Sequence, residues 1–478
     1  MTFDPNSLIP VMPELFLLTA ACAVLIIDLF LRDEQRELTY LLAQAALLTT
    51  AALALLVGGG ETQVVFDGNV VRDGMSDLLK ATIALLVFVV FLYAKQYLKD
   101  RGLFRGEFYT LGMFATIGML VMVSAGNFLT LYLGLELLAL SLYALVAFDR
   151  ESKHGAEAAM KYFVLGAIAS GMLLYGISMI YGATGSISFS GIAAALEAGE
   201  VNTLVMVFGT VFVVIGLAFK FGAVPFHVWA PDVYEGAPTA VTLFIATAPK
   251  VAALAMAIRI LSDALGGLNS DWQGMLVILA LLSLILGNVV AIAQTNIKRM
   301  LAYSTISHVG FILLGLLAGT SLGYAAAMFY AITYAITALG AFGIILLLTR
   351  KGFEADQLDD YRGLNARSPW FAAMMLLLMF SMAGVPPTVG FFAKLFVLEA
   401  AVRADLTWLV VVAVLFSVVG AYYYLRLIKL MYFDKPIDTT PLHAGMDTQI
   451  TLSVNGLAVL ALGIYPTWLM AWCIAAIG

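Results

Sequence analysis

The chain has 478 residues, of which 62% are hydrophobic and only 12% are charged, whereas soluble domains are about half apolar and about a quarter charged. This composition excludes a soluble globular enzyme, a disordered chain and a secreted disulfide scaffold. The formal net charge of -6 provides no basic surface, so we expect no nucleic-acid partner.

Long apolar runs dominate the sequence. A helix needs about 20 apolar residues to cross a bilayer, and the chain contains about fourteen such runs. We therefore expect an all-α polytopic membrane protein with about fourteen transmembrane helices. In chain order the predicted spans are 9–31, 38–57, 75–98, 108–124, 127–148, 158–182, 203–230, 238–262, 273–294, 299–319, 322–349, 370–400, 407–433 and 449–475.

The distribution of Lys and Arg orients these spans. Of the 25 basic residues, 17 follow odd-numbered spans, five lie inside spans, and three follow even-numbered spans, namely Arg72, Arg259 and Arg403. Cytoplasmic loops carry an excess of Lys and Arg. Both chain termini are therefore expected on the outer side of the membrane.

The largest outer loop and the cysteines complete this outline. In residues 62–72, two valine-rich runs flank Asp67-Gly68-Asn69, which predicts a small β-hairpin on the outer surface. Cys22 and Cys473 lie in apolar runs at opposite ends of the chain and form no CxxC motif. We therefore expect neither an iron–sulfur cluster nor a zinc site in this chain.

Five ionisable residues lie at mid-depth of five different predicted spans. They are Glu136, Lys220, Lys250, His308 and Lys394. A charge at bilayer depth costs several kcal/mol, so such residues are functional candidates by default. Lysine suits proton relay because burial disfavours its charged form, whereas a nearby carboxylate favours it. We therefore hypothesise that Glu136 and Lys220 form a pair that loads and releases a proton.

Prolines interrupt two of these spans, one in each half of the chain. Lys220 precedes Pro225, and Lys394 follows Pro386 and Pro387. Proline removes a backbone hydrogen bond, which membranes tolerate only beside protein or water. Paired interrupted helices indicate an inverted-repeat transporter with an ion site at the membrane midplane.

Each ionisable residue also has a structural interpretation. A single buried lysine can serve only to fix helix packing, and His308 is as typical of a hydrogen-bonded packing histidine as of a proton carrier. Lys161 lies one turn after Glu157 and suits an interfacial ion pair. Lys80 and Glu14 lie near the ends of their spans, where Lys80 is expected to snorkel towards the interface.

Three long motifs carry a resemblance to a known family. They are FKFGAVPFHVWAPDVYEGAPT at 219–239, QTNIKRMLAYSTISH at 294–308 and GVPPTVGF at 384–391. These motifs resemble signatures of the antiporter-like subunits of respiratory complex I and of Mrp-type cation/proton antiporters. The resemblance covers nearly the whole chain. It favours the N-type branch, because no residues remain for the C-terminal lateral helix of L-type subunits, and Lys394 stands where M-type subunits have glutamate.

The resemblance implies two inverted five-helix repeats with broken helices 7 and 12. The segments are then an N-terminal three-helix segment, a first repeat, a second repeat and a C-terminal helix, at 1–107, 108–262, 263–435 and 436–478. It also implies roles for individual residues. In the order of the proton path these are Glu136 and Lys220 as the loading pair, Lys250 as the connection, His308, and Lys394 on the exit side, with Lys161 as a further member. Lys80 and Glu399 match no position on that path.

As a member of this family, the chain is expected to be a proton-translocating subunit of NADH:quinone oxidoreductase in a bacterial inner (plasma) membrane. FMN, iron–sulfur clusters and quinone are then expected in partner subunits and no cofactor or metal in this chain. The expected partners are a neighbouring antiporter-like subunit, small K-, J- and A-type membrane subunits, the lipid bilayer and protons. The alternatives are an Mrp-type Na⁺/H⁺ antiporter subunit and a structural subunit that pumps nothing.

Overall fold

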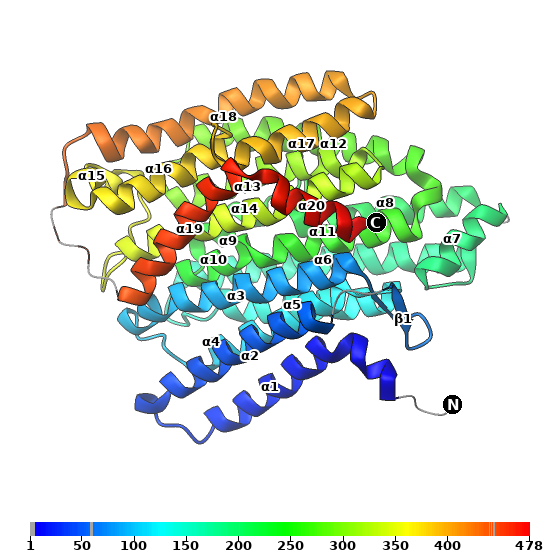
Figure 1. The fold of residues 1–478 in the computed structure, drawn as a ribbon, viewed down its shortest axis with the longest axis horizontal. Coiled ribbons are helices and arrows are strands. Elements are labelled where there is room, and N and C mark those ends of the chain that lie inside the picture. Colours follow the sequence, from blue (N-terminus) through cyan, green and yellow to red (C-terminus); the bar gives the residue numbers. More distant parts are fainter. Residues whose placement is uncertain (1–4, 58–60, 200, 439, 441, 443–444) are drawn as a thin grey trace.

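The computed structural model describes residues 5–57, 61–199, 201–438, 440, 442 and 445–478. It is one bundle of helices that run roughly side by side, with α1 and α2 at one edge and α18 at the other (Figure 1). The α-helices are α1 (Met12–Asp28), α2 (Glu37–Val57), α3 (Gly74–Asp100), α4 (Gly106–Val123), α5 (Phe128–Val146), α6 (Lys153–Thr184), α7 (Phe189–Ala198), α8 (Thr203–Phe221), α9 (Trp229–Gly236), α10 (Thr239–Ala246), α11 (Ala248–Ile258), α12 (Asn269–Ile292), α13 (Ile297–Leu317), α14 (Ser321–Leu348), α15 (Leu364–Arg367), α16 (Pro369–Ala383), α17 (Val389–Arg403), α18 (Thr407–Phe433), α19 (Met446–Ile464) and α20 (Pro466–Ile477). Short 3-10 or π turns are η1 (Pro5–Val11), η2 (Asp33–Gln35), η3 (Arg259–Ala264), η4 (Gly266–Leu268) and η5 (Leu358–Tyr361).

The prediction of an all-α polytopic membrane protein is confirmed. Within the described residues, 13 helical segments are long and apolar enough to cross a bilayer. The predicted span at 370–400 is divided into α16 and α17, each of 15 residues, which is shorter than the roughly 20 residues that a bilayer requires. The predicted span at 449–475 is likewise divided, at Tyr465, into α19 and α20.

Two helices end abruptly at glycines in the left-handed region. Gly222 follows α8 with φ +76°, and Gly384 follows α16 with φ +88°. A left-handed glycine closes a helix C-terminus, and a proline soon after it prevents the helix from continuing. The predicted interruptions near Pro225 and Pro386 are therefore present, and each leaves carbonyl groups at a helix end inside the bundle.

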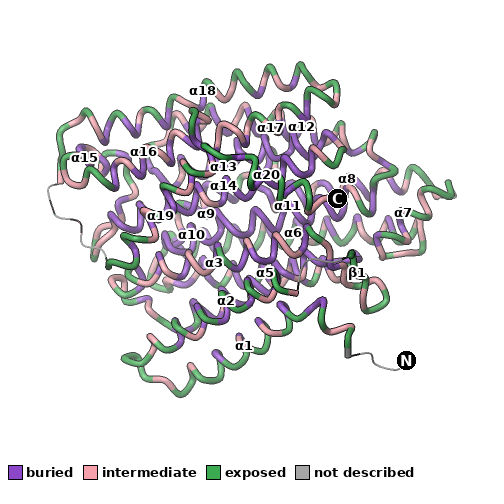
Figure 2. The backbone as a smooth tube through the Cα atoms, in the orientation of Figure 1, coloured by how far each residue is buried: buried purple, intermediate pink, exposed green. Residues whose placement is uncertain are grey.

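The buried core is formed by α10 and α11, which follow the first break, and by α13 and α14 in the second half of the chain. Every residue of α10 and α11 is buried, whereas only nine of the 27 residues of α18 are buried. Figure 2 shows this contrast between the purple interior and the green outer helices. The outer helices therefore present apolar faces that suit lipid or other membrane subunits.

The predicted β-hairpin is present. β1 (Gln63–Val65) pairs antiparallel with β2 (Val70–Arg72), with Val64 opposite Val71. The turn contains residues with positive φ, including Asp67 and Gly68, as tight hairpin turns require.

The interpretation of Lys80 as a snorkelling residue is wrong. Its side chain is fully buried, and Lys80 Nζ lies 2.7 Å from Glu14 Oε1. Ser124 Oγ donates a hydrogen bond of 3.0 Å to the same carboxylate. The Glu14 carboxylate from α1 holds Lys80 inside the bundle, and hydropathy does not encode this tertiary contact.

Candidate functional site

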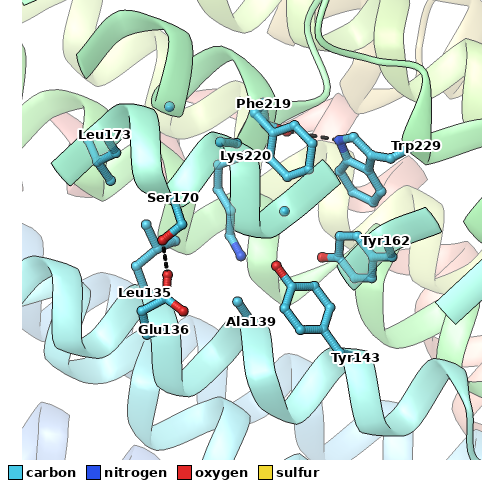
Figure 3. Close-up of a pocket in the computed structure, with 13 residues that line it drawn as sticks. Leu135, Glu136, Ala139, Tyr143, Tyr162, Ser170, Leu173, Phe219, Lys220 and Trp229 are labelled. Atoms are coloured by element: carbon cyan, nitrogen blue, oxygen red, sulfur yellow. Dashed lines mark hydrogen bonds between the residues drawn. The ribbon is translucent and has the colours of Figure 1, made fainter. Parts of the chain in front are cut away.

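Glu136 on α5 and Lys220 on α8 line the same small cavity. Its volume is about 30 Å³, which is enough for a water molecule. Figure 3 shows the Lys220 side chain reaching from α8 into the space between Glu136 and Tyr143. The two residues that the sequence paired are therefore brought together by three helices, since α6 closes the cavity with Ser170.

Glu136 is held by a neighbouring hydroxyl rather than by the lysine. Ser170 donates a hydrogen bond to the Glu136 carboxylate, and its hydroxyl lies 3.1 Å from that of Tyr132. Among the described residues, no ion pair within 4.0 Å joins Glu136 to Lys220. The arrangement thus leaves room for water between the acid and the ammonium group, and a change in their separation would alter the charge interaction.

Lys250 on α11 contacts the end of α8, the helix that carries Lys220. It is 2% exposed, and its Nζ donates a hydrogen bond of 2.8 Å to the carbonyl of Phe221, the last residue of α8. Its Nζ also lies 5.4 Å from the centroid of the Trp229 ring. Because Phe221 follows Lys220 in the chain, the break in this helix brings the two lysines to the same helix end, where the helix dipole favours a cation.

Lys394 on α17 occupies a similar position at the second break. Its Nζ donates hydrogen bonds of 2.8 Å to the carbonyl of Ala383, the last residue of α16, and of 2.8 Å to Ser417 Oγ on α18. The ammonium group lies 5.1 Å from the Phe311 ring centroid. It lines a mainly apolar cavity of about 290 Å³.

His308 on α13 lies among hydroxyl groups between the two breaks. Its Nδ1 is 2.7 Å from Tyr330 Oη, and its Nε2 is 3.1 Å from Tyr424 Oη. A small cavity of about 10 Å³ is lined by His308, Ser381 and Gly390 among others, so it adjoins the helix end that Lys394 contacts. Both ring nitrogens have partners, which suits either a packing role or proton transfer through the phenols.

Lys161 is separated from the other candidates. It lies in the third turn of α6, where its Nζ is 2.8 Å from Glu157 and 2.8 Å from Asp232. The predicted pair with Glu157 is therefore present. These residues line a polar cavity of about 360 Å³, distinct from the cavity that holds Lys220.

The structure adds a buried lysine that the sequence alone did not single out. Lys298 is 3% exposed, and its Nζ donates a hydrogen bond of 3.0 Å to the carbonyl of Ala237, immediately after α9. No pattern in the sequence signals this contact, because it depends on how α13 packs against α9. In the described part of the chain, no group of three or more His, Cys, Asp or Glu side chains is placed to hold a metal ion.

Comparison with known proteins identifies the family. Residues 125–420 match the family model described as the transmembrane region of NADH:quinone oxidoreductase and Mrp antiporters. The curated NADH-quinone oxidoreductase subunit N of Thioalkalivibrio sulfidiphilus is 60% identical over 478 residues, which is 100% of both chains.

Solved structures share the fold. A chain of respiratory complex I from Thermus thermophilus is 31% identical, with 96% of this chain and 98% of that chain covered and a TM-score of 0.84. A chain of the Mrp complex from a Dietzia species is 22% identical, with 99% and 97% covered and a TM-score of 0.86, which shows a common fold alone. The chain therefore belongs to the NADH:quinone oxidoreductase/Mrp antiporter family of transmembrane subunits and, within it, to the subunit N branch.

Proposed function

We propose that this chain is a proton-translocating membrane subunit of NADH:quinone oxidoreductase, in which quinone reduction in other subunits drives protons through its buried side chains. The observation that carries the proposal is the cavity shared by Glu136 and Lys220. A carboxylate and a lysine at bilayer depth are costly without a function, and this chain, which is 60% identical to a curated subunit N, places both in one cavity.

The path begins at the Glu136–Lys220 cavity. The proton passes from Lys220 to Lys250, which meets the same end of α8 through Phe221. It then passes by way of His308 and its tyrosine partners to Lys394 at the end of α16. Lys161 joins the path from the polar cavity that it lines.

A change in charge interaction drives the transfer. Two unit charges 4 Å apart interact by ~4 kcal/mol at an effective dielectric of about 20. Among the described residues, no ion pair within 4.0 Å joins the Lys220 ammonium group to Glu136, whose carboxylate accepts a hydrogen bond from Ser170. When Lys220 moves towards Glu136, its ammonium group keeps its proton because the carboxylate favours the charged form. When Lys220 moves away, the ammonium group releases the proton to Lys250.

The topology follows from the same proposal. The chain crosses the membrane fourteen times, with α16 and α17 together making one crossing and both termini outside. It contains an N-terminal segment, two inverted repeats and a last helix, bounded at 1–107, 108–262, 263–435 and 436–478. The left-handed glycines that end α8 and α16 support the placement of one broken helix in each repeat.

Redox chemistry belongs to partner subunits. FMN, the iron–sulfur clusters and the quinone site lie there, and this chain holds no cofactor or metal of its own. A neighbouring antiporter-like subunit and small K-, J- and A-type subunits cover its apolar outer faces in a bacterial inner membrane. The alternative is an Mrp-type Na⁺/H⁺ antiporter subunit, and the 60% identity to a curated subunit N favours the oxidoreductase.

Membranes that carry Lys220→Ala test this proposal. NADH:quinone turnover and proton pumping are expected to collapse together while the complex still assembles. Lys351→Ala is the matched control, because Lys351 is an exposed lysine outside the helices, and it is expected to behave as the unaltered protein. Wild-type turnover with wild-type pumping per electron in Lys220→Ala would overturn the proposal and support the structural-subunit interpretation.

A further inference from the structure

The short helix α9 lies between a charged network and the lysine cavity. Its first residue, Trp229, lines the cavity that holds Lys220. The indole Nε1 donates a hydrogen bond of 3.0 Å to the carbonyl of Phe219, and the ring stacks on Tyr162 with centroids 4.6 Å apart. Lys250 Nζ lies 5.4 Å from the same ring. Trp229 therefore contacts the backbone next to Lys220 and lies beside the ammonium group of Lys250. Figure 3 shows Trp229 with Lys220.

Charged side chains from α6 and α13 hold the body of α9. Asp232 lies 2.8 Å from Lys161 and 2.8 Å from Arg299. Arg299 also pairs with Glu235 at 2.9 Å. These contacts join the first and second halves of the chain through an eight-residue helix.

Lys298 makes a contact of a different kind. Whereas the Arg299 side chain is 30% exposed, Lys298 is only 3% exposed and donates to the Ala237 carbonyl at the end of α9. No carboxylate lies within 4.0 Å of its Nζ in the part of the chain that the structure describes. Glu354, Asp356 and Glu235 act on this ammonium group only through charge interactions at longer range. A buried ammonium group without a direct carboxylate partner is costly, so we ask what its position beside α9 contributes.

We propose that Lys298 is a positioning residue for proton transfer between Lys220 and Lys250, acting through α9 on Trp229. This inference rests on the proposed function. Because α9 is only about 12 Å long at 1.5 Å per residue, a shift at Ala237 moves its first residue as well. In the transfer, the Lys220 ammonium group gives up its proton and the Lys250 amine receives it, so the net charge of the pair is unchanged.

The geometry of such a transfer is sensitive to small shifts. Proton donors and acceptors must lie within about 2.6–3.2 Å of each other or be joined by one water. A misplacement of about 1 Å can slow a reaction on the order of a hundredfold. Loss of the Lys298 contact therefore slows the transfer without removing any group that carries the proton.

The test compares Lys298→Met with Lys351→Met in membranes that contain the whole complex. NADH:quinone turnover per assembled complex is measured in H₂O and in D₂O. Lys298→Met is expected to lower turnover at least threefold and to raise the H₂O/D₂O rate ratio, because proton transfer becomes rate-limiting. Lys351→Met is expected to change neither quantity. Fewer assembled complexes with normal turnover and a normal ratio would make Lys298 a packing residue and overturn the proposal.

Trp229→Leu provides a second test that does not depend on how well Lys298→Met folds. It is expected to raise the isotope ratio by itself, and the double variant is expected to turn over like Trp229→Leu alone, since both act at one place. The proposal would be overturned if the turnover losses of the two single variants multiplied in the double variant. A normal H₂O/D₂O rate ratio in Trp229→Leu would also overturn it. Lys220→Ala distinguishes the two proposals: if it collapses turnover while Lys298→Met behaves normally, only the positioning role fails.

Discussion

Lys250, Lys298 and Lys394 each donate a hydrogen bond to a backbone carbonyl at the end of a helix or directly after it. The acceptors are Phe221, Ala237 and Ala383, at distances of 2.8, 3.0 and 2.8 Å. The last carbonyls of a helix have no partner within the helix and carry a partial negative charge. These backbone carbonyls therefore supply part of the stabilisation that a carboxylate would otherwise give to a buried ammonium group, and for Lys250 and Lys394 the carbonyl comes from one of the two helix breaks.

For His308, one substitution can distinguish a packing role from a proton-carrying role. Glutamine offers a donor and an acceptor, so His308→Gln can keep hydrogen bonds to Tyr330 and Tyr424 while removing the titrating ring. Because acid–base groups typically contribute 10²–10⁴-fold, we expect turnover per assembled complex to fall at least tenfold. The measurement is NADH:quinone turnover in membranes, with assembly scored separately.

Tyr424→Phe is the control for this prediction. It removes the hydroxyl that contacts His308 Nε2 and Ser304 and leaves the imidazole in place. A smaller loss of turnover than in His308→Gln is expected. Normal turnover in His308→Gln would establish the packing role and remove His308 from the path.

At the scale of elements, the end of α16 depends on a glycine whose left-handed conformation strains any other residue. Gly384 has φ +88°, and a Cβ there would lie 2.9 Å from Lys394 Cδ. A left-handed conformation costs other residues about 1–2 kcal/mol. Gly384→Ala is therefore expected to lower the unfolding free energy by about that amount and to displace Lys394, with loss of turnover.

Thermal unfolding and turnover of the purified complex measure both effects. The matched control is Gly171→Ala in the exposed face of α6, where a Cβ would meet nothing within 4 Å. That variant is expected to be as stable as the unaltered protein or slightly more so, since alanine favours a helix. Equal behaviour of the two variants would contradict the role assigned to Gly384.

Most elements could be predicted because each long apolar run crosses a bilayer by itself and needs no knowledge of its neighbours. The breaks could be predicted for the same local reason, since the prolines beside Lys220 and Lys394 act on their own helices. Hydropathy could not predict which neighbouring helix each buried side chain contacts. Lys80 pairs with Glu14 from α1, and Lys298 meets Ala237 from another helix. Both contacts depend on tertiary packing.

At the scale of the whole molecule, the two ends of the chain determine the parity of the crossings. Gly74, at the start of α3, packs so closely on α20 that a Cβ there would lie 3.0 Å from Ala476 Cα. In Figure 1, η1 lies at the same end of the bundle as the β1–β2 hairpin that precedes α3. If both chain ends lie on one side of the membrane, the number of crossings is even, as in the proposed topology of fourteen. Among the described residues, 13 helical segments are long enough to cross singly, and α16 with α17 would supply the further crossing.

Cysteine labelling tests this topology. In a variant without Cys22 and Cys473, Val64→Cys in the exposed hairpin strand is expected to react with a membrane-impermeant maleimide added to the outer side. Lys351→Cys lies directly after α14, which is the eleventh predicted span (322–349). Because loops after odd-numbered spans are expected in the cytoplasm, this cysteine is expected to react only in inverted vesicles. Labelling of both cysteines from one side would mean that α14 or another segment between them does not cross as proposed. Labelling of Lys351→Cys from the outer side and of Val64→Cys only in inverted vesicles would mean that the whole bundle has the opposite orientation. Because proton pumping is directional, the second outcome would also reverse the direction assigned to Lys394 as the exit.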